Sequence, residues 1–381
     1  MANIWTPAPV PKTPLGEYRL LAPSAGVRVS PLVLGGMSLG NKWNEFMGGG
    51  MSKEQAFELL DAYYDAGGNV IDTANNYQDE QSEEWIGEWM QQRKNRDQIV
   101  LATKYSIGYI RARDDIAIKV NYTGNARKSL HVSVRDSLAK LHTDYIDLLY
   151  VHWWDYTTPV EELMHALDAL VKAGKVLYLG ISDTPAWVVA RANGYARAHG
   201  LSQFVVYQGR WNLLMRDFER DILPMCKAEG MGVAPWGVMG QGRFRTAAQL
   251  EERKKLGNLR GGADPTPAET KISAALEKVA KELGGGVTLS QVAIRYVMDK
   301  QAYVFPIIGG TKLRYLQDNI EALKIKLSPE QIAFLESAVP FDFGFPHNMI
   351  GQDPALTDGR STNRLLTHTS RIEYVKAEKP L

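Results

Sequence analysis

The sequence has 381 residues, of which 45% are hydrophobic and 23% charged, a composition typical of a globular protein with a large core. The net charge at pH 7 is +1 and no long basic stripe is present, so no nucleic-acid partner is expected. No apolar run reaches the ~18 residues of a membrane span, and the N-terminus lacks the pattern of a signal peptide. Together with a single cysteine, Cys226, these features predict a cytosolic protein in a reducing compartment.

Short apolar runs alternate along the chain with longer segments of helical periodicity. Residues 1–16 are proline-rich and are expected to form an irregular arm. Helix signals are clear in places: Ser52 and Gln55 form a capping box, and Gly67 is expected to end the helix that follows. Continuous apolar runs are typical of parallel strands covered on both faces. Eight such runs are rich in Val, Ile and Leu: 32–36, 69–73, 99–104, 145–152, 176–182, 204–208, 232–236 and 304–310.

Eight strand–helix repeats predict a (β/α)8 TIM barrel, whose core needs roughly 250 residues. The alternative fold is a doubly wound open sheet. We predict one barrel domain over residues 1–381, with its core at about 17–338 and a C-terminal tail at 339–381. The surplus residues are expected to form long loops over the active face, at 105–125, at 241–267 and in the tail from Pro340.

Polar and aromatic residues stand at the ends of the predicted strands, where barrel enzymes carry their chemistry. A buried lysine at Lys104 needs a partner, and Asp72 at the end of the neighbouring strand can supply one. Alone, this pair would be interpreted as a structural ion pair. The full set of strand ends comprises Asp72 (followed by Tyr77), Lys104, His152, Ser182 with Asp183, Gln208 and Trp236.

Together with Tyr77 and His152, the ion pair is expected to form a site that donates a proton to the substrate. A free tyrosine has a pKa near ~10 and donates poorly at neutral pH. Because a nearby cation favours the phenolate, we expect Lys104 to lower the pKa of Tyr77. Asp72 would then keep Lys104 charged and in position, and His152 would orient a carbonyl oxygen.

These residues resemble the aldo-keto reductases. The matching segments run in family order: DTANNY (72–77), TK (103–104), VHW (151–153), GIS (180–182), YQGRWNLL (207–214), APWGVMGQG (234–242) and PIIGGTKLRYLQDN (306–319). The long inserts and the last segment are similar to the fungal aryl-alcohol dehydrogenase branch. The resemblance implies four catalytic positions: Tyr77 as proton donor, Asp72 and Lys104 as its support, and His152 orienting the substrate.

The resemblance also implies NADP(H), bound in an extended pose without a GxGxxG motif. Trp236 matches the aromatic residue on which the nicotinamide ring stacks, and Ser182 and Gln208 match the residues that grip its carboxamide. Many relatives have Asn where this chain has Asp183, and a carboxylate cannot donate to the amide oxygen. The remaining positions toward the nicotinamide and pyrophosphate are Gly36, Met37, Asp72, Gly237, Val238, Met239, Gly240, Gln241 and Gly242.

The adenosine end of the cofactor matches the segment that begins at Gly309. Lys312 or Arg314 can pair with a 2′-phosphate and so select NADP over NAD. The chain departs from some branches here, because Gly309 stands in place of a phosphate-binding lysine and Tyr315 in place of an arginine. The other matching positions are Thr311, Asp318 and Asn319, and Arg243, Arg245 and Arg260 are candidates to clamp the phosphates.

Aromatic residues flank the site positions and favour a flat aryl aldehyde as substrate. The candidate pocket residues are Trp43, Tyr105, Trp153 and Trp154, with Tyr109 nearby and Phe341, Phe343 and Phe345 in the tail. Two other functions stay open: a reductase of another carbonyl (polyketide, sugar, aliphatic aldehyde or ketone), and a non-catalytic NADPH-sensing subunit. The scattered histidines give no metal-binding motif, so no metal is expected. The sequence leaves the oligomeric state open.

Overall fold

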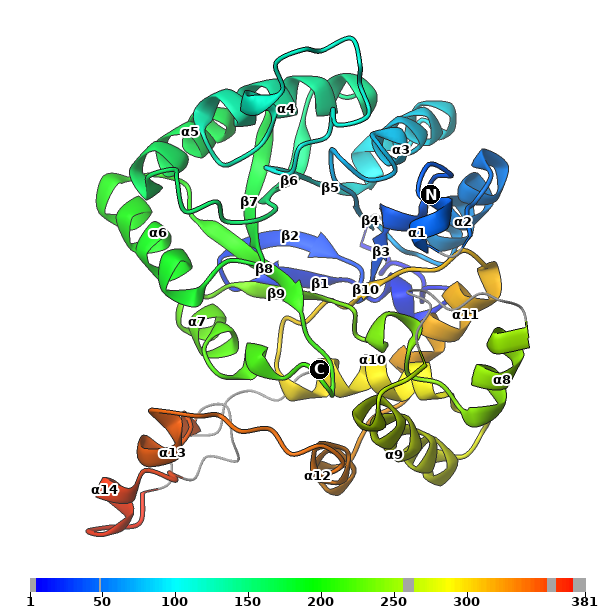
Figure 1. The fold of residues 1–381 in the computed structure, drawn as a ribbon, viewed down its shortest axis with the longest axis vertical. Helices are drawn as coiled ribbons and strands as arrows, with labels where there is room; N and C mark the ends of the chain where they lie inside the picture. Colours follow the sequence, from blue (N-terminus) through cyan, green and yellow to red (C-terminus); the bar gives the residue numbers. More distant parts are fainter. Residues whose placement is uncertain (1–4, 48, 256–263, 355–360, 373–381) are drawn as a thin grey trace.

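Parallel strands ringed by helices form the centre of the structure (Figure 1). The computed structural model describes residues 5–47, 49–255, 264–354 and 361–372. Within these residues, eight strands pair side by side in the order β10-β3-β4-β5-β6-β7-β8-β9, each parallel to its neighbour. They are β3 (Val33–Gly35), β4 (Val70–Asp72), β5 (Val100–Tyr105), β6 (Ile146–Val151), β7 (Val176–Ser182), β8 (Phe204–Arg210), β9 (Gly232–Trp236) and β10 (Ile307–Ile308).

The sheet closes on itself between β9 and the segment leading into β10. Val233 and Val304 form a parallel bridge. The amide of Val233 donates to Tyr303 O at 2.9 Å, and the amide of Phe305 donates to Val233 O at 2.8 Å. The predicted barrel is therefore confirmed, although its last strand is shorter than the predicted run over 304–310.

Helices follow the strands and cover the outside of the barrel (Figure 1). The predicted capping box is present at Ser52, and Gly67 follows the end of that helix with φ +99°. The helices are α1 (Asn44–Met47), α2 (Lys53–Asp65), α3 (Gln81–Arg93), α4 (Arg127–Lys140), α5 (Val160–Lys172), α6 (Ala186–His199), α7 (Ile222–Ala228), α8 (Ala247–Lys255), α9 (Pro267–Leu283), α10 (Leu289–Lys300), α11 (Leu313–Glu321), α12 (Pro329–Ser337), α13 (His347–Ile350) and α14 (Arg364–Thr367).

The pleat of each strand decides which side chains enter the barrel, because successive residues point to opposite faces. On β5, Ala102 belongs to the cluster that fills the barrel, whereas Leu101 and Tyr105 belong to the cluster beneath the helices. Lys104 is two residues from Ala102 and so points inward. The same alternation on β4 sends Asp72 to the inside with Val70.

An N-terminal hairpin closes one end of the barrel and was missed by the sequence analysis. Strands β1 (Arg19–Ala22) and β2 (Ala25–Val29) pair antiparallel and lie across the barrel centre in Figure 1. Leu21 and Val29 line a small internal hollow that also contacts Asp72 and Gln208. The hairpin therefore seals the floor beneath the site.

The three surplus segments have different structures. The segment after β5 is the expected long loop, with one turn of 3-10 helix at Val120–Tyr122. The segment predicted as a loop after β9 contains α8, and Arg260 lies outside the described residues.

The described parts of the tail, 339–354 and 361–372, do not reach over the site as expected. Its short helices α13 and α14 extend away from the barrel (Figure 1). Arg220 donates to Phe343 O at 2.8 Å and lies 5.1 Å from the ring of Phe341, while Phe345 is 78% exposed. The tail is thus attached to the segment between β8 and α7.

Candidate active site

A buried ion pair lies at the ends of the neighbouring strands β4 and β5. Lys104 Nζ is 2.6 Å from Asp72 Oδ2 and donates a second bond to Thr73 O at 2.7 Å. Gln208, on β8, donates to the other Asp72 oxygen at 2.9 Å. Both carboxylate oxygens and the ammonium therefore have partners, as burial of charged groups requires.

Tyr77 and His152 lie beside this pair, so the structure brings the four predicted catalytic residues together. Lys104 Nζ is 5.1 Å from the centre of the Tyr77 ring. The rings of Tyr77 and His152 meet edge to face with their centres 5.8 Å apart. His152 Nδ1 is buried without a hydrogen-bond partner among the described residues.

The charges of these groups follow from their burial. Burial raises the pKa of Tyr77 well above its usual value, and the carboxylates of Asp72 and Asp183 add to the rise. Burial also lowers the pKa of Lys104, although Asp72 opposes this, and it lowers the pKa of His152 with help from Lys104. The expected lowering of the Tyr77 pKa by Lys104 is therefore wrong. Desolvation of the partly buried phenol outweighs a cation that Asp72 already neutralises.

Tyr150 is a further member of the site that the sequence analysis missed. It points into the barrel from β6, and Lys104 Nζ lies 5.6 Å from its ring centre. The ring leaves room only for glycine at Gly180 on β7, because an added Cβ there would lie 2.5 Å from ring atoms. The signal was present in the sequence, since Tyr150 is two residues from His152 and shares its side of the strand.

The residues expected to grip a nicotinamide line the ends of β7, β8 and β9. Ser182 and Gln208 are buried, and Trp236 is half-buried. Ser182 Oγ donates to Asp183 Oδ2 at 3.4 Å, and Asp183 has φ +42°, in the left-handed region. Because Gln208 already donates to Asp72, it couples this wall to the ion pair.

Asp183 gives the site a pH-dependent charge. Burial raises the pKa of Asp183 to about 6. Hydrogen bonds from Trp236, Ser182 and Trp153 and the charge of Lys104 oppose this rise. The folded state then holds this proton to higher pH than the unfolded state, so the stability contribution of Asp183 falls as pH rises from about 4 to about 6.

We expect Asp183→Asn to stabilise the protein more at pH 8 than at pH 4. Asn tolerates the left-handed backbone and carries no charge at either pH. The gain in free energy of unfolding should be larger at pH 8 by on the order of 2 kcal/mol, measured by urea denaturation of variant and wild type. A gain independent of pH would contradict a raised pKa at this position.

The segment after β9 has a backbone suited to wrap a pyrophosphate. Gly237, Gly240 and Gly242 have φ of +68°, +60° and +83°, values that glycine adopts without steric cost. Asn212 anchors the start of the segment by donating to Gly237 O at 2.9 Å. Arg245 Nε donates to Gly242 O at 2.5 Å, which keeps a cation beside the segment. The residues Val238, Met239 and Gln241 belong to the same turn.

The expected adenosine site lies at the start of α11. Gly309, Thr311, Lys312 and Arg314 are exposed there. Arg314 donates to the hydroxyl of Tyr315 at 3.3 Å. Asp318 instead accepts from Thr288 Oγ1 at 3.0 Å and Gln291 Nε2 at 2.7 Å, at the start of α10. Asp318 therefore holds two helices together, and Asn319 is buried beside it.

Gly36 and Met37 stand at the end of β3, next to the backbone oxygen of Asp72. That oxygen would lie 3.0 Å from a Cβ added at Gly36.

The candidate substrate aromatics divide into two groups. Trp43 meets Tyr77 edge to face at 6.3 Å, Trp154 packs partly buried over the core, and Trp153 is 56% exposed. The prediction that Tyr105 lines the substrate pocket is wrong. Its side chain is 1% exposed, and its hydroxyl donates to Asn125 O at 3.1 Å. It neighbours Lys104 on the strand, so the pleat turns it away from the barrel interior.

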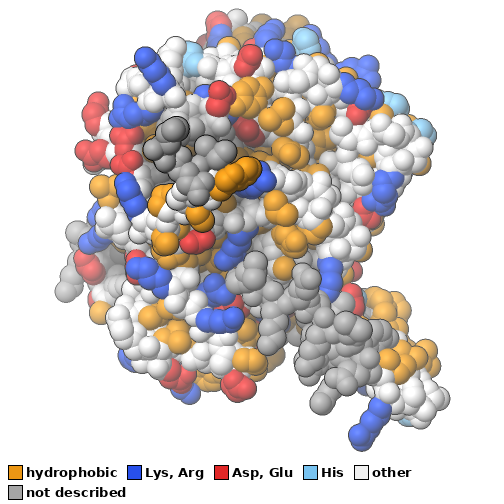
Figure 2. All heavy atoms as spheres, turned by 180° about the vertical axis from the view of Figure 1, so that it is seen from behind, with side chains coloured by type: hydrophobic (Ala, Val, Ile, Leu, Met, Phe, Trp, Pro, Cys, Tyr) orange, Lys and Arg blue, Asp and Glu red, His pale blue; other side chains and the backbone are white. Residues whose placement is uncertain are grey.

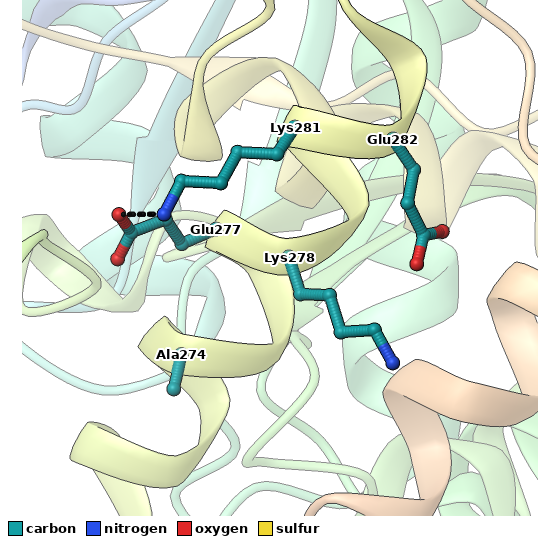
Figure 3. Close-up of a pocket in the computed structure, with 5 residues that line it drawn as sticks. All are labelled: Ala274, Glu277, Lys278, Lys281 and Glu282. Atoms are coloured by element: carbon teal, nitrogen blue, oxygen red, sulfur yellow. Dashed lines mark ion pairs between the residues drawn. The ribbon is translucent and has the colours of Figure 1, made fainter.

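A hollow on the outer surface of α9 does not compete with this site (Figure 3). It is lined by charged side chains of one helix face, and Lys281 pairs with Glu277 at 2.9 Å. Lys278 lies 4.2 Å from the ring of Phe334.

Among the described residues, no cluster of three or more metal-ligating side chains occurs, and no helix could span a membrane. On the face in Figure 2, acidic and basic side chains are interspersed.

Comparison with known proteins assigns the chain to a family. The family model described as "Aldo/keto reductase family" matches residues 31–340. The chain belongs to the aldo/keto reductase family.

Relatives match nearly the whole chain. It is 56% identical over 384 residues to the "Aryl-alcohol dehydrogenase [NADP(+)]" of Phanerodontia chrysosporium, covering 98% of this chain and 97% of that protein. It is 53% identical over 382 residues to the "Aldo-keto reductase ausK" of Aspergillus calidoustus, covering 100% of this chain and 96% of the relative. Identity to "Norsolorinic acid reductase A" of Aspergillus parasiticus is 51% over 380 residues, covering 98% of this chain and 95% of the relative.

Proposed function

We propose that this protein is an NADP(H)-dependent oxidoreductase that interconverts aryl aldehydes and aryl alcohols. The observation that carries the proposal is the buried Asp72–Lys104 pair beside Tyr77, with the His152 ring meeting the phenol ring edge to face. Family membership supports hydride chemistry at this site. The name of the 56% identical relative supports both the cofactor and the aryl substrate.

The residues present fit the cofactor. The left-handed glycines 237, 240 and 242 allow close backbone approach, and Trp236 offers a ring face. When bound, NADPH supplies the hydride for the carbonyl carbon. Arg243 and Arg245 lie along the same segment as candidate phosphate partners.

Tyr77 would protonate the carbonyl oxygen as the carbon–oxygen double bond becomes single. The O–H bond of Tyr77 breaks and leaves a phenolate, which the charge of Lys104 stabilises at 5.1 Å from the ring centre. An alkoxide is a stronger base than a phenolate, so the transfer is favourable even though burial raises the pKa of Tyr77. His152, neutral because burial lowers its pKa, can donate one N–H to the same oxygen.

The test is NADPH oxidation, followed by absorbance, with 3,4-dimethoxybenzaldehyde and related aryl aldehydes. We expect turnover with NADPH and weak turnover with NADH. Activity confined to polyketide, sugar or aliphatic carbonyls would overturn the aryl substrate and leave the reductase. NADPH binding without turnover of any carbonyl would favour the sensing role.

Removing the positive charges at the start of α11 should weaken NADPH binding selectively. A charge-assisted hydrogen bond to a phosphate contributes about 1.5–3 kcal/mol, so Lys312→Ala or Arg314→Ala should raise the Kd for NADPH by about 10-fold or more. The Kd for NADH, which lacks the 2′-phosphate, should stay unchanged, as measured by fluorescence quenching. Lys324→Ala is the control, because Lys324 pairs with Glu321 at 2.7 Å and lies beyond α11. Equal weakening of both cofactors would contradict the assignment.

We also propose a reducing, cytosolic setting. Cys226, the single cysteine in the sequence, is buried and free. A lone buried thiol is compatible with a compartment that does not form disulfides.

A further inference from the structure

Three segments of the active face meet at one carboxylate, Asp79. Trp43, from the segment between β3 and α2, donates its indole N–H to Asp79 Oδ1 at 3.1 Å. Arg111, from the long loop after β5, donates Nε to the same oxygen at 3.1 Å. The guanidinium of Arg111 also lies 5.4 Å from the centre of the Trp43 ring. Asp79 therefore connects two loops that are separate in sequence.

The backbone that presents Asp79 is strained and held in place. Gln78, Asp79 and Glu80 have φ of +54°, +50° and +81°, directly after Tyr77. Such values cost roughly 1–2 kcal/mol per residue for side chains other than glycine, so surrounding contacts must maintain them. Gln78 accepts from the Trp43 amide at 2.9 Å and donates to Met37 O at 2.9 Å. Glu80 accepts from Lys140 Nζ at 3.0 Å.

Trp43, which Asp79 holds by a hydrogen bond, lies next to Tyr77, the proposed proton donor. The Trp43 ring meets the Tyr77 ring at 73° with centres 6.3 Å apart. Any carbonyl that Tyr77 protonates must lie against the phenol hydroxyl. An aryl group attached to that carbonyl therefore comes close to the Trp43 ring. A hydrogen bond to the indole N–H fixes the ring plane, and a cation over its face adds a second restraint.

We propose that Asp79 is a positioning residue that fixes Trp43 beside Tyr77 and thereby determines affinity for aryl aldehydes. Arg111 completes the arrangement by joining the long loop to the same carboxylate. The proposal rests on the proposed function for its substrate class. The contact between Asp79 and Trp43 can be tested without any substrate.

The kinetic test uses Asp79→Gly, because glycine keeps the left-handed backbone while removing the carboxylate. We expect the KM for 3,4-dimethoxybenzaldehyde to rise about tenfold, while kcat stays within about twofold of wild type. This pattern is expected because the lost contact stabilises the bound substrate and the transition state equally. The KM for propanal, which has no ring, should stay within about twofold. Asp79→Asn keeps an acceptor oxygen for the indole and should show a smaller rise. Asp115→Asn, which breaks the Arg113–Asp115 pair of the same loop at 2.6 Å, should change neither KM.

A double mutant tests whether Asp79 acts through Trp43. Trp43→Phe removes the indole donor, so adding Asp79→Gly to it should raise the KM by less than about twofold further. Independent effects that multiply would overturn the proposal, as would equal rises in KM for both aldehydes.

A substrate-free measurement separates this proposal from the proposed function. With 5-fluorotryptophan incorporated, Trp43→Phe identifies the Trp43 signal in the 19F spectrum. Asp79→Gly should shift or broaden that signal, and Asp115→Asn should not. An unchanged signal would overturn the contact, whereas a shifted signal in a protein that turns over no aryl aldehyde would overturn only the proposed function.

Discussion

Replacing Tyr77 with phenylalanine is expected to lower kcat for aryl aldehyde reduction by about 10²–10⁴-fold, the usual contribution of a positioned general acid. The variant keeps the ring that contacts Trp43 and His152 and loses only the hydroxyl. No other described side chain beside Lys104 combines a phenol with the contact to His152, since the described ring contacts of His152 are with Tyr77 and Trp153 and not with Tyr150. The measurement is steady-state NADPH oxidation under saturating aldehyde.

The control and the pH profile make this prediction specific. Tyr156→Phe, at a phenol that is 71% exposed, should leave kcat unchanged. The Kd for NADPH of Tyr77→Phe should match wild type, which shows that the site is intact. Because burial raises the pKa of Tyr77, the wild-type rate should not fall between pH 7 and 9 through loss of the phenol proton. A residual rate within about tenfold of wild type would assign proton donation to another group.

The direction of the Tyr77 pKa illustrates what the sequence could not supply. The residues identify a cation near a phenol, and charge alone predicts a lowered pKa. The opposite result depends on how far the Tyr77 phenol is removed from solvent and on the way Asp72 takes up the charge of Lys104, both of which require coordinates. The identities of the four residues were readable because parallel strands bring their carboxyl ends to one face.

Other features differ in how far local patterns determine them. The inward position of Lys104 and the outward position of Tyr105 follow from strand pleating, so the assignment of Tyr105 to the pocket was avoidable. The function of the hairpin β1–β2 depends on what lies beneath the barrel, and the sequence of 19–29 does not reveal that. The contact of Asp79 with Trp43 and Arg111 needs three consecutive left-handed residues, which tertiary contacts impose against local preference.

Removing the charge of Lys104 should have the largest effect on stability. Lys104→Met leaves the Asp72 carboxylate buried with Gln208 as its remaining side-chain partner, and breaking a buried pair in this way costs about 3–5 kcal/mol. Urea denaturation measures the loss. Lys53→Met is the matched control, because Lys53 forms an exposed pair with Glu88 at 2.6 Å and should change the free energy of unfolding by less than about 1 kcal/mol.

The double variant Asp72→Asn with Lys104→Met decides between a structural and a catalytic role for the pair. With both charges gone, no uncompensated charge stays buried, so most of the lost stability should return. Activity should remain low, because the phenolate left by Tyr77 no longer has a cation 5.1 Å from its ring centre. Recovery of stability without activity therefore separates folding from catalysis in one protein. Recovery of both would reduce Asp72–Lys104 to a structural ion pair, and proton donation by Tyr77 would then need no support from it.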